Sequence, residues 1–288
     1  MLKTLLTLIL SLAGACLLAQ DYSFVEAKTG NVLEISDLAR ILAQYDIVFF
    51  GEWHDDSAVH EAQRELLAAL YACQPRLLLS FEMFERDTQS ALDAYLAGQT
   101  SEEQFLAVSR PWPNYASDYR PLIEFAKAQN LACLAANVPR RLARAAAQTG
   151  KSFLDSLSIE DRDWVARQVS APPGRYRDNF LSTMQANAMH GNTQNEDLYD
   201  RLYYAQCVKD DTMAESILRL GEQRPGDKIV HFNGDFHSRE FLGTVERVRS
   251  RAPQLRLAVL SPHPANEPLP ENADQIADFF VLVPGAQE

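Results

Sequence analysis

The stretch from residue 46 to residue 73 constrains the fold of this chain more than any other. It opens with four large apolar residues at 47–50, which predict a strand buried on both faces. Residues 57–72 are rich in Ala, Leu, Glu and Gln with apolar positions three and four apart, and this spacing predicts a helix. Strand, polar turn and helix form half of a βαβ unit. Ligands of such sheets bind beyond the carboxyl ends of the strands, where Glu52 and His54 lie.

Further strands alternate with helical segments along the rest of the chain. They are expected at residues 77–81, 131–136, 229–232, 255–260 and 279–283, after a short hairpin within 21–35. This alternation predicts an α/β fold with a mostly parallel central sheet and helices on both faces. From about residue 152 to residue 222 the pattern is helical without a strand, which predicts a helical cap inserted into a single domain spanning 20–288.

Residues 1–19 have the composition of a signal peptide. Lys3 precedes an apolar stretch, Leu5 to Leu12, that is too short to span a bilayer. Cleavage is expected after Ala19. Lipid attachment to Cys16 is the alternative, but Ala13 stands where such sites usually carry a branched apolar residue. We therefore expect an exported protein, periplasmic or membrane-associated, with cleavage favoured over a lipid anchor.

Charge and missing motifs exclude several classes of function. The net charge of −12 argues against nucleic acid and against anionic membrane surfaces as partners. The chain has no G-x-S-x-G nucleophile elbow, no phosphate-binding loop, no G-x-G-x-x-G after its first strand and no H-E-x-x-H zinc motif. A c-type haem attachment motif is also absent.

Carboxylates and imidazoles follow the predicted strands where each strand ends. The residues are Glu52, His54, Glu82 and His237. Because the carboxyl ends of parallel strands meet at one edge of a sheet, we expect these four side chains to cluster there. Two imidazoles with carboxylates can hold a divalent metal such as Zn²⁺ or Mn²⁺. Without a metal, carboxylates crowded in an apolar site acquire the split pKa values that suit acid/base catalysis.

The long helix expected from about residue 195 to residue 221 has an unusual second face. One face carries an apolar stripe that is typical of a core contact. The other carries Tyr199, Tyr203, Gln206 and Asp210, a mixture that is unusual for a face in contact with solvent. The cap therefore presents polar and aromatic groups that could cover a ligand.

At these residues the sequence resembles the ChaN family of haem-binding proteins, which belongs to a wider group with the Tiki metalloproteases and the erythromycin esterases. The segments that carry the resemblance are Gly51-Glu52-Trp53-His54-Asp55, Phe81-Glu82-Met83, Tyr204-Ala205-Gln206, Asp211-Thr212-Met213-Ala214 and Gly234-Asp235-Phe236-His237-Ser238. The resemblance implies that Glu52, His54, Glu82 and His237 match the shared site of the group, which is a metal or catalytic centre in its enzymes. It also implies haem bound between the subunits of a homodimer, through a tyrosine on iron, in an iron-uptake system of the outer membrane.

The haem ligand cannot be assigned by motif. Family members often carry a tyrosine shortly after the last histidine, whereas Phe241 occupies that region here. Phenolate and imidazole are both accepted axial ligands of haem iron. The candidates in the cap and the aromatic loop are Tyr115, Tyr119, Tyr176, His190, Tyr199 and Tyr203.

Three functions remain open from the sequence. The first is an exported haem-binding protein that takes part in iron or haem acquisition, and the resemblance favours it. The second is a hydrolase, metal-dependent or metal-free, that uses Glu52, His54, Glu82 and His237, and the intact set of carboxylates and imidazoles favours it. The third is a member without catalysis or haem whose partner is another protein. A titration with haemin separates the first from the others.

Overall fold

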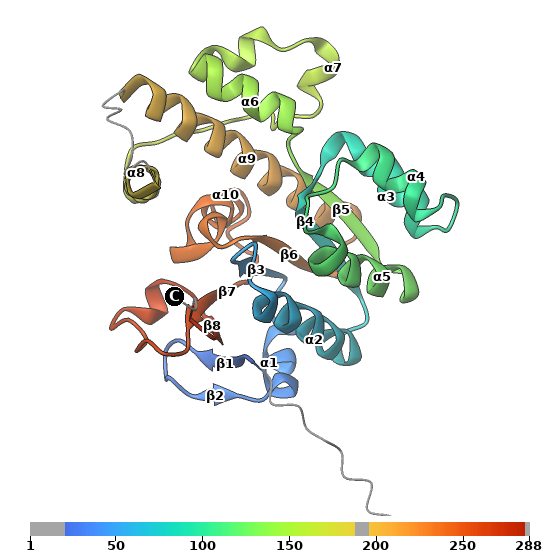
Figure 1. Cartoon of the computed structure of the whole chain (residues 1–288), viewed down its shortest axis with the longest axis vertical. Coiled ribbons are helices and arrows are strands. Elements are labelled where there is room, and N and C mark those ends of the chain that lie inside the picture. The colour runs from blue at the N-terminus through green and yellow to red at the C-terminus, as the bar shows by residue number, and fades with distance from the viewer. Residues whose placement is uncertain (1–20, 188–195, 286–288) are drawn as a thin grey trace, which may run out of the picture.

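The computed structural model describes residues 21–187 and 196–285, and Figure 1 shows a central sheet with helices around it. The sheet has eight strands in the order β2-β1-β8-β7-β3-β6-β4-β5. The strands are β1 Ser23–Glu26, β2 Val32–Leu33, β3 Ile47–Glu52, β4 Leu77–Glu85, β5 Ala132–Asn137, β6 Lys228–Gly234, β7 Leu257–Pro264 and β8 Phe279–Val283.

Most neighbouring strands run parallel, so the predicted fold class is confirmed. The strands β8, β7, β3, β6, β4 and β5 pair in parallel, and only β1 and β2 at one edge pair antiparallel. Several strands end later than predicted, among them β3 at Glu52, β6 at Gly234 and β7 at Pro264. Strand β4 continues to Glu85, and its register with β5 shifts between Phe81 and Glu85, so Glu82 lies within the strand rather than after it.

Helices cover both faces of the sheet (Figure 1). They are α1 Ile35–Leu42, α2 Ser57–Cys73, α3 Gln89–Leu96, α4 Glu102–Ser109, α5 Arg120–Ala128, α6 Arg140–Thr149, α7 Ile159–Arg162, α8 Arg175–Asn187, α9 Glu196–Gln223 and α10 Gly243–Arg251. Short 3-10 turns lie at Arg86–Thr88, Gly150–Ser156, Asp235–His237, Arg239–Phe241 and Ala273–Gln275, and a π-helical turn at Tyr115–Tyr119.

The alternation of side chains along β3 divides the core between the two faces. Val48 and Phe50 point to one face, where they join the apolar side chains of α1, α2 and α5 in one cluster. Ile47 and Phe49 point to the other face, where Ile217 of α9 and residues of α10 complete a second cluster. Because every residue of β3 is buried, the continuous apolar run at the start of this unit is explained.

The helices between β5 and β6 extend beyond the sheet. Helix α6, the turn at Gly150–Ser156 and the first half of α9 share a small core of their own, separate from the two sheet clusters. The second half of α9 returns to the sheet. The segment expected as a cap at 152–222 therefore contains both a distal part and a helix half that covers the sheet. The expected signal peptide at 1–19, with Cys16, lies outside the described residues.

Gln89 protects the exposed edge of β5. Its side-chain Nε2 donates to the Cys133 carbonyl at 2.8 Å, and its Oε1 accepts from the Ala135 backbone N–H at 2.7 Å. The amide thus takes the place of a neighbouring strand, in a part of the sheet that would otherwise present unpaired backbone groups.

Replacing Gln89 with Ala is expected to lower the free energy of unfolding by about 1–3 kcal/mol, because a partly buried donor and acceptor lose their partners. Hydrogen exchange at the Ala135 amide should become faster, while exchange in the centre of the sheet stays slow. Gln89→Glu is the matched control, since it keeps the acceptor for Ala135 and removes the donor to Cys133. Unchanged exchange at Ala135 in the alanine variant would contradict this role.

Within the described ranges 21–187 and 196–285, none of the helices combines the length and the apolar character needed to cross a bilayer.

Candidate functional site

Glu52 at the end of β3 is a buried carboxylate held by three donors. Its Oε1 accepts from the Tyr119 hydroxyl at 2.7 Å and lies 2.9 Å from His54 Nδ1. Its Oε2 accepts from Gln63 Nε2 at 2.8 Å. His60 in turn lies 2.9 Å from the Gln63 carbonyl oxygen, so the first turns of α2 orient the amide that holds Glu52. The sequence places these groups together because β3, the turn and α2 are consecutive.

His54 lies against the backbone of β6 with its ring partly exposed. A Cβ atom at Gly234 would stand 2.7 Å from both Cε1 and Nε2 of the ring, so only glycine permits this approach. Trp112 packs edge-on against the ring, with 4.8 Å between the ring centres. Although burial acts to lower the pKa of His54, the hydrogen bond with Glu52 and the negative charges of Glu82 and Glu52 raise it.

A second group surrounds His237, which lies between two carboxylates. Its Nε2 is 3.1 Å from Glu82 Oε1, and its Nδ1 is 2.7 Å from Asp210 Oδ1. Glu82 Oε2 also accepts from the Gly234 backbone N–H at 2.8 Å. Asp210 accepts further hydrogen bonds from the Tyr176 hydroxyl at 2.6 Å and from the Thr244 hydroxyl. All of the site groups in this cluster are buried.

The ionisation of this cluster follows from its geometry. Burial opposes a charge on His237, but the charges of Glu82 and Asp210 and their hydrogen bonds raise its pKa to about 9. Burial likewise opposes the charge of each carboxylate, and the imidazolium outweighs it, so the pKa values of Glu82 and Asp210 lie below their usual range. At neutral pH the cluster is therefore a buried cation between two anions.

Asp235 stands at the end of β6 beside the cluster. Its Oδ1 accepts from the Ser261 hydroxyl at 2.7 Å, and Arg239 lies 3.3 Å from its Oδ2. A Cβ at Gly51 would come within 2.5 Å of this carboxylate, which explains the glycine at the end of β3. Burial raises the pKa of Asp235 to about 6, against the opposing charge of Arg239.

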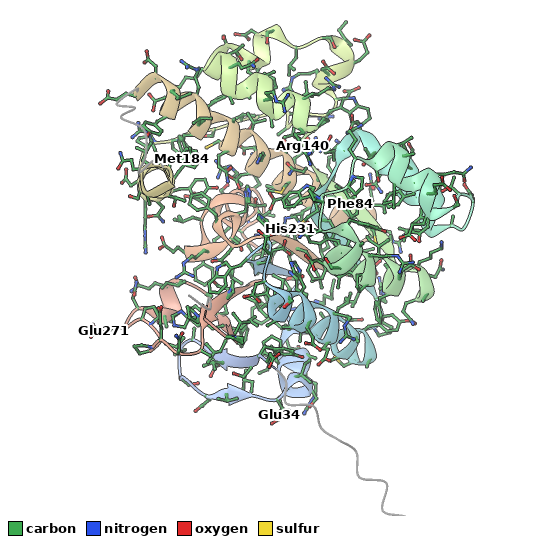
Figure 2. The ribbon with its side chains drawn as sticks, in the orientation of Figure 1. Glu34, Phe84, Arg140, Met184, His231 and Glu271 are labelled. Carbon is green, nitrogen blue, oxygen red and sulfur yellow. The ribbon has the colours of Figure 1, made fainter. Side chains whose placement is uncertain are left out.

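Five of these residues line an open cleft of about 780 Å³ and form its floor: Glu52, His54, Glu82, Asp235 and His237. Its walls are largely apolar and aromatic, with Trp53, Trp112, Phe180, Met184 and Phe236. Figure 2 places Met184 on α8, across from the sheet. Two cationic side chains, Lys209 and Arg239, also line the cleft. Its size and its apolar walls with a few polar groups are typical of a site for a small organic ligand.

The structure brings together the four residues expected at the sheet edge. Glu52, His54, Glu82 and His237 all line the cleft, and Gly234 separates the Glu52–His54 pair from the Glu82–His237 pair. Asn137, the last residue of β5, accepts from the Val138 N–H through its side chain and does not line the cleft.

The expected divalent metal is not supported by this arrangement. Among residues 21–187 and 196–285, no group of three or more His, Cys, Asp and Glu side chains is disposed to hold a metal ion. The reason is that the imidazoles and carboxylates are already hydrogen-bonded to each other, with Asp210 and Glu82 flanking His237. The metal-dependent hydrolase gains no support from the geometry.

The tyrosines considered as haem ligands lie mainly in the interior. Tyr119 donates to Glu52, Tyr176 donates to Asp210, and Tyr203 donates to the Pro172 carbonyl at 2.8 Å. Tyr115 is buried against Phe84 and Phe105. The pKa of each of these four phenols is raised, and burial is the largest cause.

The remaining two candidates are Tyr199 and His190. Tyr199 is partly exposed on α9 and does not line the cleft, and His190 lies outside the described residues. That one of the six candidate residues coordinates the haem iron stays a prediction.

Sequence reasoning missed the groups that support the site. Gln63 is a polar residue on the buried side of α2, beside His60, and Trp112 lies in an irregular loop, so no apolar periodicity marked either Gln63 or Trp112. Asp210 did leave a signal, because it lies on the polar-aromatic face of α9 together with Gln206. Gln206 Nε2 lies 3.3 Å from both ring nitrogens of His237.

Comparisons with known proteins agree with this fold. A family model described as haem-binding uptake, Tiki superfamily, ChaN matches residues 38–248. The structure of ChaN of Campylobacter jejuni, solved for its cofacial haem binding, superimposes with a TM-score of 0.70 at 14% identity. The match covers 93% of this chain and 98% of that one, and at this identity it shows the shared fold.

A more distant structural match is a mutant of the erythromycin esterase EreC in its open conformation, with a TM-score of 0.49 at 13% identity over 92% of this chain and 83% of that one. The search of curated protein sequences found no match.

Proposed function

Because this chain belongs to the haem-binding uptake family ChaN of the Tiki superfamily, we propose that it binds haem in the cleft at the carboxyl edge of the sheet. We propose further that it is exported and takes part in iron or haem acquisition. The observation that carries haem binding is the open cleft of about 780 Å³ with flat aromatic walls above a floor of imidazoles.

The walls suit a flat apolar macrocycle. The five apolar wall residues are half-buried, so they keep apolar area for contact: Trp53, Trp112, Phe180, Met184 and Phe236. Burial of apolar surface contributes about 25 cal/mol per Å², which makes a porphyrin face a strong source of affinity. The polar groups of the floor then orient the ligand.

The charges of the cleft suit the haem propionates. Lys209 and Arg239 line the cleft, and each is a cation with which a propionate can pair, although Arg239 also lies 3.3 Å from Asp235 Oδ2. Haem fits the donor set as well, because imidazole is an accepted axial ligand of its iron. When bound, haem would supply its iron as cargo, and the residues of this chain would hold and orient it.

An open site favours a second copy of the chain as a partner. ChaN of Campylobacter jejuni binds haem cofacially, and a haem in the present cleft would keep one face accessible because the cleft is open. We therefore propose that haem binding promotes a homodimer in which the two open clefts face each other.

Addition of haemin to the full chain is expected to give a saturable shift of the Soret band with one haem per chain. Met184→Asp should weaken binding by about tenfold or more, because a charge replaces apolar contact with the porphyrin. Gln185→Asp is the matched control on α8, since Gln185 is exposed and does not line the cleft. Equal losses in both variants, or a Soret band that does not saturate, would overturn the proposal.

Export predicts a mature protein that begins at Gln20. Mass spectrometry of the protein recovered from the periplasmic or extracellular fraction should give the mass expected after cleavage following Ala19. Diacylglycerol on Cys16 would contradict this and would show the lipid-anchored form.

A further inference from the structure

We propose that a second pocket, beside the edge strand β5, binds a small organic oxyanion, that is, a carboxylate or a phosphate on an apolar body. The pocket has a volume of about 490 Å³ and lies between β5, the second half of α9 and the segment 162–167. Figure 1 shows β5 at this edge of the sheet, next to α9. The pocket shares no described lining residue with the haem cleft, so the inference is independent of the haem binding proposed above.

The pocket carries an excess of positive charge in a chain whose net charge is −12. Its charged lining residues are four arginines and two carboxylates: Arg86, Arg162, Arg167 and Arg219, with Asp163 and Glu215. A local surplus of cationic side chains attracts anions. Guanidinium groups bind carboxylates and phosphates through paired, charge-assisted hydrogen bonds. The lining therefore favours an oxyanion over a neutral or cationic ligand.

Glu215, the carboxylate in contact with these arginines, has both of its oxygens occupied. Its Oε1 accepts from Arg86 at 3.2 Å and lies 3.9 Å from Arg219. Its Oε2 accepts from the Arg167 backbone N–H at 2.8 Å. Burial lowers the pKa of Arg86 to about 10, and the charge of Arg219 acts in the same direction, against the opposing charge of Glu215. One carboxylate thus stands against two guanidinium groups, and a bound anion would balance the charge that is left.

Two of the guanidinium groups keep their donors free for a ligand. Within residues 21–187 and 196–285, the Arg167 side chain makes no hydrogen bond or ion pair, and Arg219 has only its long contact with Glu215. Both side chains are exposed. Arg162, by contrast, donates to three backbone carbonyls in the segment 165–167. These hydrogen bonds fix the turn that carries Arg167, so one arginine of the pocket positions another.

Apolar side chains complete the lining of the pocket. Trp164, Leu134 and Leu220 are half-buried, so each keeps apolar area that a ligand can cover. The indole of Trp164 offers a flat face against which a ring can stack. A ligand with an apolar body beside its charged group would use both kinds of lining, whereas an inorganic ion would use the arginines alone.

Isothermal titration calorimetry of the haem-free full chain with phthalate and with phenyl phosphate tests the proposal. Both probes are dianions with one aromatic ring near neutral pH, so the pair distinguishes a carboxylate ligand from a phosphate ligand. At constant ionic strength we expect saturable binding of at least one of them, with one site per chain and weaker binding of inorganic phosphate. Arg219→Gln and Arg167→Gln should each weaken this binding by about tenfold, because each removes a charge-assisted hydrogen bond.

Arg224→Gln is the matched control and should leave binding unchanged, since Arg224 is an exposed arginine that pairs with Asp227 and does not line the pocket. The proposal is overturned if neither organic anion gives saturable binding, or if inorganic phosphate binds as tightly as both of them. Equal losses of affinity in Arg224→Gln and Arg219→Gln would also overturn it. Haemin titrations of the same variants should match the wild type, because none of the changed residues lines the cleft. Failure of the anion site therefore leaves the proposed function standing.

Discussion

Replacement of Asp210 by Ala is expected to lower the free energy of unfolding by about 3–5 kcal/mol, because it leaves a buried imidazolium with one of its two counter-charges. Asp210 is fully buried on α9 and accepts from His237, Tyr176 and Thr244. Its loss leaves two buried hydroxyls without their acceptor and His237 paired with Glu82 alone. The measurement is urea unfolding of the haem-free protein followed by circular dichroism.

Two further variants make the result specific. Asp210→Asn keeps the shape and an acceptor oxygen but removes the charge, so its loss of stability should be smaller than that of Asp210→Ala. Asp200→Ala is the control on the same helix. Asp200 pairs with Arg177 at the surface, and 59% of the Asp200 side chain is exposed. An exposed pair contributes little, so this change should stay within about 1 kcal/mol of the wild type. Equal losses for Asp210→Ala and Asp200→Ala would show that the buried cluster does not stabilise the fold.

The layers of the fold were predictable because they depend on local patterns. The fully apolar run at 47–50 and the helical period of 57–72 each report burial of that segment, and the structure confirms both as β3 and α2. Asp56 is the N-cap of α2, and its side chain accepts from the N–H groups of Ala58 and Val59. Such signals need only a few neighbouring residues.

The order of the strands was not predictable in the same way. Strand β6 lies between β3 and β4, although helices α3 to α9 and strand β5 separate β4 from β6 in the sequence. Pairing of Phe50 with Phe232 and of Phe81 with Phe232 depends on contacts between distant segments. An apolar pattern records that a strand is buried, but it does not record which strands flank it.

The candidate site shows the same division. Glu52, His54 and His237 follow their strands directly, so their convergence could be expected from the parallel sheet alone. The hydrogen bonds that decide their chemistry come from elsewhere, through Tyr119 of the aromatic loop and Asp210 of α9. The same contacts take up the Tyr119 hydroxyl, which residue type alone had suggested as an iron ligand. The hydrogen-bond partner of a tyrosine hydroxyl depends on tertiary structure, and no sequence motif records it.

The pH dependence of stability offers the second large effect. The free energy of unfolding is expected to fall by about 3 kcal/mol as pH rises from about 6.5 to about 9. His237 keeps its proton in the fold up to a pKa of about 9, whereas in the unfolded chain it loses the proton near 6.5. Its stabilisation is therefore complete below about pH 6.5 and is lost as pH rises through about 9. His54, whose pKa is also raised, acts in the same direction.

Other groups near the cluster act mainly in acid. The pKa values of Glu82 and Asp210 are lowered, so their stabilisation is present above about pH 4 and is lost as pH falls. Burial lowers the pKa of His231 to about 3. The unfolded chain therefore takes up a proton at His231 below about pH 6.5 while the folded chain does not, and the fold loses stability as pH falls. Asp235 has a pKa raised to about 6, so it acts in the opposite direction: its contribution is present below about pH 4 and is lost as pH rises to about 6. The interval from about pH 6.5 to pH 9 thus isolates the two site histidines.

Urea unfolding of the haem-free wild type and of His237→Gln at about pH 6.5, 7.5 and 9 measures this effect. The wild type should lose stability steadily across the interval, since each pKa unit corresponds to about 1.4 kcal/mol. His237→Gln should be less stable at pH 6.5 and should keep only the smaller slope that His54 contributes, because glutamine carries no proton that the fold retains. Asp210→Asn removes one of the two anions that raise the pKa of His237, so it should reduce the slope without abolishing it. A slope of the same size in His237→Gln would show that another group titrates, and the ionised cluster between Glu82 and Asp210 would have to be abandoned.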